Sequence, residues 1–279
     1  MTDFQAVSAI GAFHLPDDGM SSERLTRVAQ LLGDDWMTLL DAQATADRIN
    51  QETLGAWFPR SAIVHGAQLC QELLQHDLIQ VSTNREYEFP ACEDIPTIYA
   101  TGGEMPDQLV GLPIEAIVIP GQVDAFSIRN SSRPLRHIIA RNGYVAPQDK
   151  LLFAGSTYEY KPWSDGEATR VNRARIESLL ADVSLQHERS FRASRVVTSD
   201  RLPIAGKIAN QCWVSGAHGS GGTISAPFAA ELIASTILNE VPAGSSGIPR
   251  LLAPDRFRHR QARRPNPLAR GFRTGPSSA

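Results

Sequence analysis

The most informative segment for chemistry lies between an apolar strand and a helix near the C-terminus. It runs from Trp213 to Ala234 and contains four closely spaced glycines. Glycine allows a ligand to approach the backbone, and the first N–H groups of a helix carry the positive end of its dipole. The pattern predicts a site for a phosphate or the electron-rich edge of a ring, formed by Gly216, Gly219, Ser220, Gly221, Gly222, Thr223 and Ile224. A closely packed strand–helix turn is the alternative, since Ile224 occupies the last glycine position of a G-x-G-x-x-G motif.

A second candidate segment precedes this loop and begins at Arg195. It reads Arg195-Val-Val-Thr-Ser-Asp-Arg-Leu-Pro-Ile-Ala-Gly206, so the arginine lies in a strand pattern of apolar residues. A guanidinium in such a place needs an anionic partner, because its charge is costly to bury alone. A carboxylate held by two hydrogen bonds would serve as a ligand. A salt bridge to a protein Asp or Glu remains the alternative.

Four further residues are weaker candidates. His218 lies beside the glycine loop and could act on a bound ring or substrate, or could simply be satisfied by the backbone. Tyr144 and Tyr158 end predicted strands and could line a substrate pocket or belong to the core. Gly102 follows a predicted strand, where glycine suits the close approach of a ligand. Asp124 and Glu159 show no paired spacing typical of general acid–base catalysis.

The elements that must position these residues mix strands and helices along the whole chain. Apolar periodicity predicts helices around Leu25–Leu32, from Trp36 to Asp47, and over 66–76, 165–182 and 222–239. Predicted strands are Ala12–Leu15, Leu78–Val81, Tyr87–Phe89, Thr97–Ala100, Glu115–Pro120, Gln122–Ile128, Leu135–Val145, Leu151–Tyr158, Phe191–Thr198 and Cys212–Gly216. The fold class is therefore α/β or α+β with a substantial antiparallel sheet.

Composition and charge narrow the functional classes. The 279 residues are 42% hydrophobic and 20% charged with a net charge of −3, which excludes a generally basic nucleic-acid binder. The tail from Pro254 to Arg273 is different, because it holds seven arginines against Asp255 and so predicts contact with a polyanion. Cys70, Cys92 and Cys212 form no metal-binding motif and indicate reduced thiols. With no basic leader at the start, a cytoplasmic location is expected.

The Arg195 segment followed by the glycine loop resembles the C-terminal part of FAD-dependent amine oxidoreductases of the D-amino-acid oxidase/glycine oxidase type. A narrower resemblance, from about residue 10 to residue 264, is to the oxidase half of the bifunctional tRNA 5-methylaminomethyl-2-thiouridine biosynthesis proteins. The matching stretches are Gly11-Ala-Phe-His-Leu15, Trp57-Phe-Pro59, Gln68-Leu-Cys70, Gly121-Gln-Val123, Asn142-Gly-Tyr144, Ala154-Gly-Ser-Thr-Tyr158, His218-Gly-Ser220, Ser225-Ala-Pro227 and the Arg256-Phe257 pair of the tail.

The chain also departs from the family pattern. The family opens with a strand–GxGxxG–helix unit that holds the FAD pyrophosphate, and no GxGxxG occurs in this sequence. Gly221 replaces the usual arginine after His-Gly-Ser, and Ser61-Ala-Ile63 replaces the usual Gly-Gly-Trp. The methyltransferase half is also absent. We therefore expect a shortened member, in which a partner chain could supply the dinucleotide-binding half.

The resemblance implies a partial FAD-binding domain (59–104 and 195–245) interleaved with an antiparallel-sheet substrate domain (1–58 and 105–194), followed by an Arg-rich tail (246–279). It implies FAD as cofactor, a substrate carboxylate bound by Arg195, and tRNA as a partner of the tail. The implied reaction removes the carboxymethyl group from carboxymethylaminomethyl-uridine at the tRNA wobble position. An amino-acid oxidase of the glycine/sarcosine type and a non-catalytic remnant or partner subunit remain as alternatives.

Overall fold

The computed structural model describes residues 4–86, 94–102, 114–129, 134–180, 183–242 and 244–258. The predicted strand Tyr87–Phe89, Cys92 and the tail arginines from Arg260 onward lie outside these residues. The chain divides into two compact units: unit 1 comprises residues 1–81 and 120–193, and unit 2 comprises residues 82–119 and 194–279. Each unit is therefore assembled from two separate stretches of the chain.

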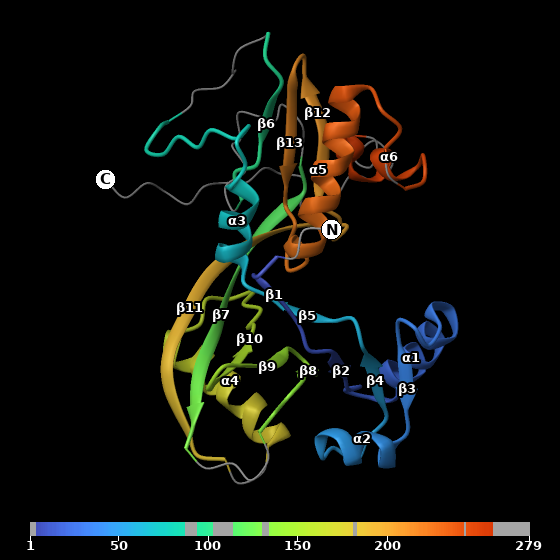
Figure 1. The fold of residues 1–279 in the computed structure, drawn as a ribbon, viewed down its shortest axis with the longest axis vertical. Coiled ribbons are helices and arrows are strands. Elements are labelled where there is room, and N and C mark those ends of the chain that lie inside the picture. The colour runs from blue at the N-terminus through green and yellow to red at the C-terminus, as the bar shows by residue number, and fades with distance from the viewer. Residues whose placement is uncertain are drawn as a thin grey trace. The chain divides into compact units, whose positions relative to one another are not determined.

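An eight-stranded, mainly antiparallel sheet contains most of the strands, in the order β11-β7-β10-β9-β8-β2-β4-β3. The strands are β2 (Ala12–His14), β3 (Thr38–Leu40), β4 (Gly55–Phe58), β7 (Ala116–Ile128), β8 (Ile138–Ala140), β9 (Tyr144–Gln148), β10 (Leu151–Gly155) and β11 (Leu185–Thr198). A separate pair joins β1 (Val7–Ala9) to β5 (Ala62–Val64). This architecture confirms the predicted mixed α/β class (Figure 1).

Four helices accompany these strands: α1 (Gly19–Leu32), α2 (Ala42–Ile49), α3 (Gly66–Leu74) and α4 (Asp165–Leu179). The main core of unit 1 forms where α4 packs on the sheet through Ile176 and Leu179. These side chains meet Phe126, Val145 and Ala154, none of which is exposed to solvent. One face of β7, β9 and β10 therefore looks toward α4.

Four predictions of secondary structure need correction. The helix expected over Trp36–Asp47 is instead β3 followed by α2, because the Asp41 carboxylate accepts the Ala44 N–H at 2.8 Å and so caps a new helix.

The strand expected over Leu135–Val145 is a hairpin of β8 and β9, turned where Asn142 and Gly143 adopt positive φ. The strand expected over Leu78–Val81 is absent; Leu78 is 89% exposed and pairs with no described strand. The two strands predicted between 115 and 128 form one, β7.

Unit 2 is built on a three-stranded sheet ordered β12-β13-β6. Its strands are β12 (Ile204–Ala209), β13 (Cys212–Gly216) and β6 (Thr97–Tyr99), and β6 runs parallel to β13. Helices α5 (Gly222–Leu238) and α6 (Ile248–Leu252) cover it, burying Trp213, Leu232 and Leu252 (Figure 1). The sequence did not indicate β12 or α6.

The units and the predicted domains have different boundaries. Residues 59–81, which were predicted to belong to the FAD-binding domain, are part of unit 1. The second stretch of unit 1 begins at Pro120, whereas the second stretch of the substrate domain was predicted to begin at residue 105. The assignment of flavin and substrate domains to these parts stays a prediction. Among the described residues no helix is both long and apolar enough to cross a membrane.

Candidate functional site

The glycine loop is tied to the strand that carries Arg195. The Gly219 N–H donates to the Val196 carbonyl at 3.1 Å, and His218 forms an antiparallel bridge with Val197. Gly219 has φ +58°, a conformation that L side chains rarely adopt, so the turn itself favours glycine here. The backbone therefore brings the predicted loop to the two residues that follow Arg195.

Helix α5 begins with an open N-terminus. Its N-cap is Gly221, and among the described residues no side chain caps the first turn through a hydrogen bond. A Cβ added at Gly221 or Gly222 would meet its nearest neighbour at 3.9 or 3.6 Å, which is ordinary contact. Protein packing therefore does not require glycine at these two positions. Bare backbone at a helix N-terminus without a packing need is typical of a site that admits a ligand.

Gly102 belongs to the same end of the unit 2 sheet. It follows β6, whose residue Tyr99 pairs in parallel with Val214 of β13, and β13 ends at Gly216. An added Cβ at Gly102 would meet no atom within 4 Å. Ligands of α/β folds bind beyond the carboxyl ends of parallel strands. The structure thus collects the predicted cofactor residues of unit 2 at one sheet edge.

Arg195 lies on β11, half-buried, immediately before the buried residues Val196 and Val197. Because those two residues pair with the glycine loop, Arg195 is the strand residue next to the loop contact. This position agrees with a role at the same site, and its role in binding a carboxylate stays a prediction.

The two ring nitrogens of His218 both have partners. Ser225 Oγ donates its hydrogen to the Gly221 carbonyl at 3.0 Å, so it accepts from His218 Nδ1 at 2.9 Å. Burial lowers the pKa of His218, which favours the neutral ring. Its Nε2 then accepts from Ser215 Oγ at 3.1 Å. This geometry favours a role in holding the loop over direct proton transfer, and a catalytic role stays a prediction.

Arg256 of the tail is part of the fold. Its guanidinium donates twice to Asp200, with Nε–Oδ2 at 2.9 Å and Nη2–Oδ1 at 3.1 Å, and the two side chains are 10% and 17% exposed. Burial alone would raise the pKa of Asp200. Hydrogen bonds from Arg256 and from the Leu202 N–H, with the charge of Arg256, outweigh burial and lower it. Phe257 beside it is fully buried, so the tail is docked into unit 2 at least this far.

We expect Asp200→Asn to lower the free energy of unfolding at pH 7 by about 3–5 kcal/mol, because it leaves Arg256 without its counterion. The stabilisation exists above the unfolded-state pKa of about 3.9 and is lost as pH falls through the lower folded-state pKa. The difference in the free energy of unfolding between variant and wild type should therefore shrink below about pH 4. Urea unfolding at several pH values measures it, with Asp255→Asn at an exposed neighbour as the control. An unchanged difference at low pH would contradict this account.

The two predicted substrate tyrosines lie in unit 1. On β9, Tyr144 alternates with Val145, which faces the α4 side of the sheet. Thr157 and Glu159 are buried and donate their N–H groups to Gln122 and Pro120 of β7, which extends the pairing beyond β10. Tyr158 between them then points to the opposite face. Alternation therefore puts Tyr144 and Tyr158 on the same side of the sheet, away from α4.

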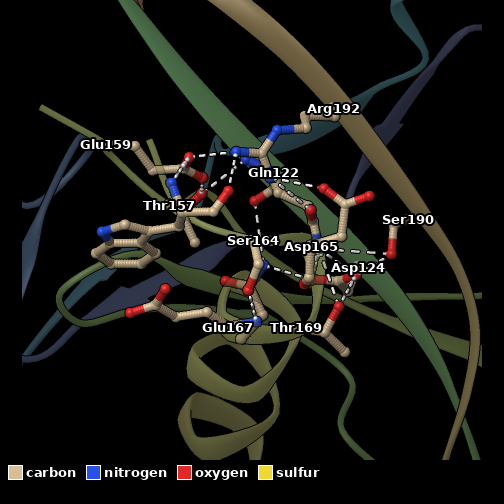
Figure 2. Close-up of polar contacts among 12 residues, drawn as sticks. Gln122, Asp124, Thr157, Glu159, Ser164, Asp165, Glu167, Thr169, Ser190 and Arg192 are labelled. Carbon is tan, nitrogen blue, oxygen red and sulfur yellow. Dashed lines mark hydrogen bonds and ion pairs between the residues drawn. The ribbon is translucent and has the colours of Figure 1, made fainter. Parts of the chain in front are cut away.

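Sequence reasoning missed a buried polar cluster on the other side, which Figure 2 shows. The Asp124 side chain is fully buried and accepts hydrogen bonds from Ser190 Oγ at 2.5 Å and Asn172 Nδ2 at 2.7 Å. Gln122 and Thr169 also donate to it. Burial alone would raise the pKa of Asp124, but these hydrogen bonds together lower it. Asp124 is therefore a charged anchor that joins β7, β11 and α4.

Arg192 lies at the other end of this polar cluster. Its guanidinium contacts the Glu159 carboxylate, donates to Gln122 Oε1 at 3.0 Å and forms an ion pair with Asp165 at 3.1 Å (Figure 2). Thr157 Oγ1 donates to Glu159 Oε1 at 2.6 Å. The signal in the sequence was polar residues at every second position of a buried strand: 122 and 124 on β7, then 157 and 159 after β10.

Comparison with known proteins decides the family. The profile of the FAD dependent oxidoreductase (DAO) family matches residues 4–236. The chain belongs to this family. The tRNA 5-methylaminomethyl-2-thiouridine biosynthesis bifunctional protein MnmC of Ectopseudomonas mendocina is 26% identical to this chain over 91% of the chain and 47% of the relative. The MnmC protein of Thiobacillus denitrificans is 27% identical over 73% of the chain and 38% of the relative.

Solved structures agree on the fold of the oxidoreductase. Glycine oxidase from Geobacillus kaustophilus superposes with a TM-score of 0.70 at 17% identity, covering 88% of this chain and 75% of that one. Iminodiacetate oxidase from Chelativorans sp. BNC1 gives a TM-score of 0.66 at 17% identity, covering 86% and 75%. The chain spans about half the length of the curated relatives it matches.

Proposed function

We propose that this oxidoreductase removes the carboxymethyl group of carboxymethylaminomethyl-uridine in tRNA, using FAD. The observation that carries the proposal is the relationship to MnmC proteins, which extends over 91% of the chain and so covers residues of both units. The net reaction converts the substituted glycine, O₂ and water to the primary amine, glyoxylate and H₂O₂. A cytoplasmic location would follow from a tRNA substrate.

The residues present fit the flavin end of FAD. Gly102, Gly216, Gly219, Ser220, Gly221, Gly222, Thr223 and Ile224 would hold it, at the sheet edge and at the open N-terminus of α5. When bound, FAD accepts the hydride equivalent from the amine Cα–H bond and passes the electrons to O₂. The positive end of the α5 dipole would stabilise negative charge on the reduced ring.

The other side chains have positioning roles in this proposal. Arg195 binds the glycine carboxylate of the substrate through two charge-assisted hydrogen bonds. His218 keeps the loop in place through Ser215 and Ser225. Tyr144 and Tyr158 offer the substrate-facing side of the unit 1 sheet. The strands that carry them are fixed from behind by the buried cluster around Asp124.

Fewer than the seven arginines of the tail would contact tRNA phosphates. Arg256 is engaged by Asp200 within unit 2, so phosphate contacts would come from the tail arginines that begin at Arg260. The missing pyrophosphate motif would come from a partner chain or an additional segment.

An amino-acid oxidase of the glycine/sarcosine type is the second candidate, favoured by the fold shared with glycine oxidase. A non-catalytic subunit is the third, favoured by the lack of a GxGxxG motif. Both keep the same fold, so the substrate assay must separate them.

The test uses the chain fused behind a strand–GxGxxG–helix segment and loaded with FAD. We expect kcat/KM for tRNA bearing carboxymethylaminomethyl-uridine to exceed that for glycine or sarcosine at least a hundredfold, about 2.7 kcal/mol of transition-state binding. Glyoxylate and H₂O₂ formed in equal amounts are the readout. Faster oxidation of glycine or sarcosine would establish the second candidate, and no turnover of any amine by the FAD-loaded fusion would favour the third.

A further inference from the structure

Arg175 on α4 is a partly buried cation. Its guanidinium donates through Nη1 to Asn172 Oδ1. In the part of the chain that the structure describes, no carboxylate forms an ion pair with it. Burial lowers the pKa of Arg175, which means that its surroundings disfavour the charge. A guanidinium has five N–H donors, and the bond to Asn172 uses one of them.

The side chain is held in place by a buried polar chain. Asn172 is fully buried, and its Nδ2 donates to Asp124 Oδ2 at 2.7 Å and to the Gln122 carbonyl at 3.1 Å. These two bonds fix the orientation of the amide, because both partners are acceptors. Asn172 Oδ1 must then face Arg175. Asp124 thus determines through Asn172 where the guanidinium lies.

The backbone of the β8–β9 hairpin makes room for this guanidinium. A Cβ built on Gly143 would lie 2.7 Å from Arg175 Nε and 2.8 Å from the Gly155 carbonyl oxygen, so a larger residue here would force the guanidinium or the backbone to shift. Gly143 also has φ +119°. The next residue is Tyr144, whose electrostatic effect raises the pKa of Arg175 and so opposes the larger effect of burial. The guanidinium therefore reaches the end of β9, beside the first residue of the predicted substrate face.

We propose that Arg175 is an oxyanion-binding residue, which takes a carboxylate or a phosphate group at the Gly143–Tyr144 end of β9. The reasons are a planar donor held by Asn172, a glycine whose missing Cβ leaves room for the guanidinium beside the hairpin, and a partly buried positive charge with which no described carboxylate forms an ion pair. An incoming oxyanion supplies that counterion and accepts two parallel N–H groups. This site goes beyond the proposed function and requires no flavin.

Ligand-dependent unfolding of the purified chain tests the site. Thermal unfolding is followed in chloride buffer of constant ionic strength with increasing inorganic phosphate or, separately, iminodiacetate. We expect saturable stabilisation. Arg175→Met should raise the apparent dissociation constant of the anion at least tenfold. Arg170 is an exposed arginine of the same helix, and Arg170→Met should leave this constant unchanged. Stabilisation by phosphate alone would identify a phosphate site, and stabilisation by iminodiacetate alone a carboxylate site.

Two further measurements keep the outcome clear. Phenylglyoxal labelling of the wild-type chain, mapped by peptide mass spectrometry, should show Arg175 protected by the stabilising anion while Arg170 is not. Arg195→Leu should retain the Arg175-dependent stabilisation, which separates this site from the proposed substrate carboxylate site. Equal losses in the Arg170 and Arg175 variants, no anion effect on the wild type, or no protection of Arg175 would each overturn the proposal.

Discussion

Purified alone, this chain should bind FAD at least a hundredfold more weakly than the same chain fused behind a strand–GxGxxG–helix segment. The isolated chain offers an edge for the flavin ring at Gly102 and the α5 N-terminus, but no GxGxxG backbone for the pyrophosphate. Each hydrogen bond to a charged phosphate contributes about 1.5–3 kcal/mol, so two of them exceed the 2.7 kcal/mol that a hundredfold represents. Flavin fluorescence titration measures both affinities.

The matched control is a fusion in which the glycines of the added motif are replaced by valine. It keeps the extra strand and helix but blocks close approach of the pyrophosphate, so it should bind like the isolated chain. An isolated chain that copurifies with one FAD per molecule would show that its own residues suffice, and the need for a second segment would be disproved.

Arg195→Leu should reduce kcat/KM of the FAD-loaded fusion for the carboxymethylaminomethyl substrate by about ten- to a hundredfold or more. The change removes a charge-assisted pair of about 1.5–3 kcal/mol and leaves the substrate carboxylate without a cation. Because 1.4 kcal/mol corresponds to a tenfold effect, the lower limit of the loss is one order of magnitude. Steady-state kinetics of H₂O₂ production measure it.

Arg189→Leu is the control for general charge effects, since Arg189 is an exposed arginine on the same strand. It should retain most of the activity. A substrate amine without a carboxylate should react equally slowly with the wild type and the Arg195 variant. If Arg195→Leu turns over the carboxylate substrate at the wild-type rate, the arginine does not bind it and its role is structural.

The glycine loop illustrates what the sequence could predict. Strand Cys212–Gly216 and the helix from Gly222 were both expected, because a run of apolar residues, a glycine cluster and a second apolar run have few other solutions. Gly102 was expected after a strand and follows β6, which ends at Tyr99, whereas Tyr144 was expected near the end of a strand and is instead the first residue of β9. Local signals of this kind depend on neighbours in the chain, which a sequence displays directly.

The polar cluster behind the unit 1 sheet could not be predicted in the same way. The Asp124 carboxylate accepts hydrogen bonds from Asn172, 48 positions away, and from Ser190, 66 positions away. Only the folded sheet brings these residues together. The error at Leu78–Val81 has the converse cause: four residues with strand propensity form no strand where no described strand lies beside them. Pairing over long separations, more than intrinsic propensity, decided both cases.

The interleaving of the units has a consequence for synthesis on the ribosome. Unit 1 has all its parts once residue 193 has emerged, whereas β6 of unit 2 must wait for β13, which follows about 110 residues later. At translation rates of about 5–20 residues per second, this delay lasts about 5–20 seconds. During that time β6 is a nascent strand without its partner, open to pairing with other chains. Its length of only three residues limits that hazard, because short edges template aggregation poorly.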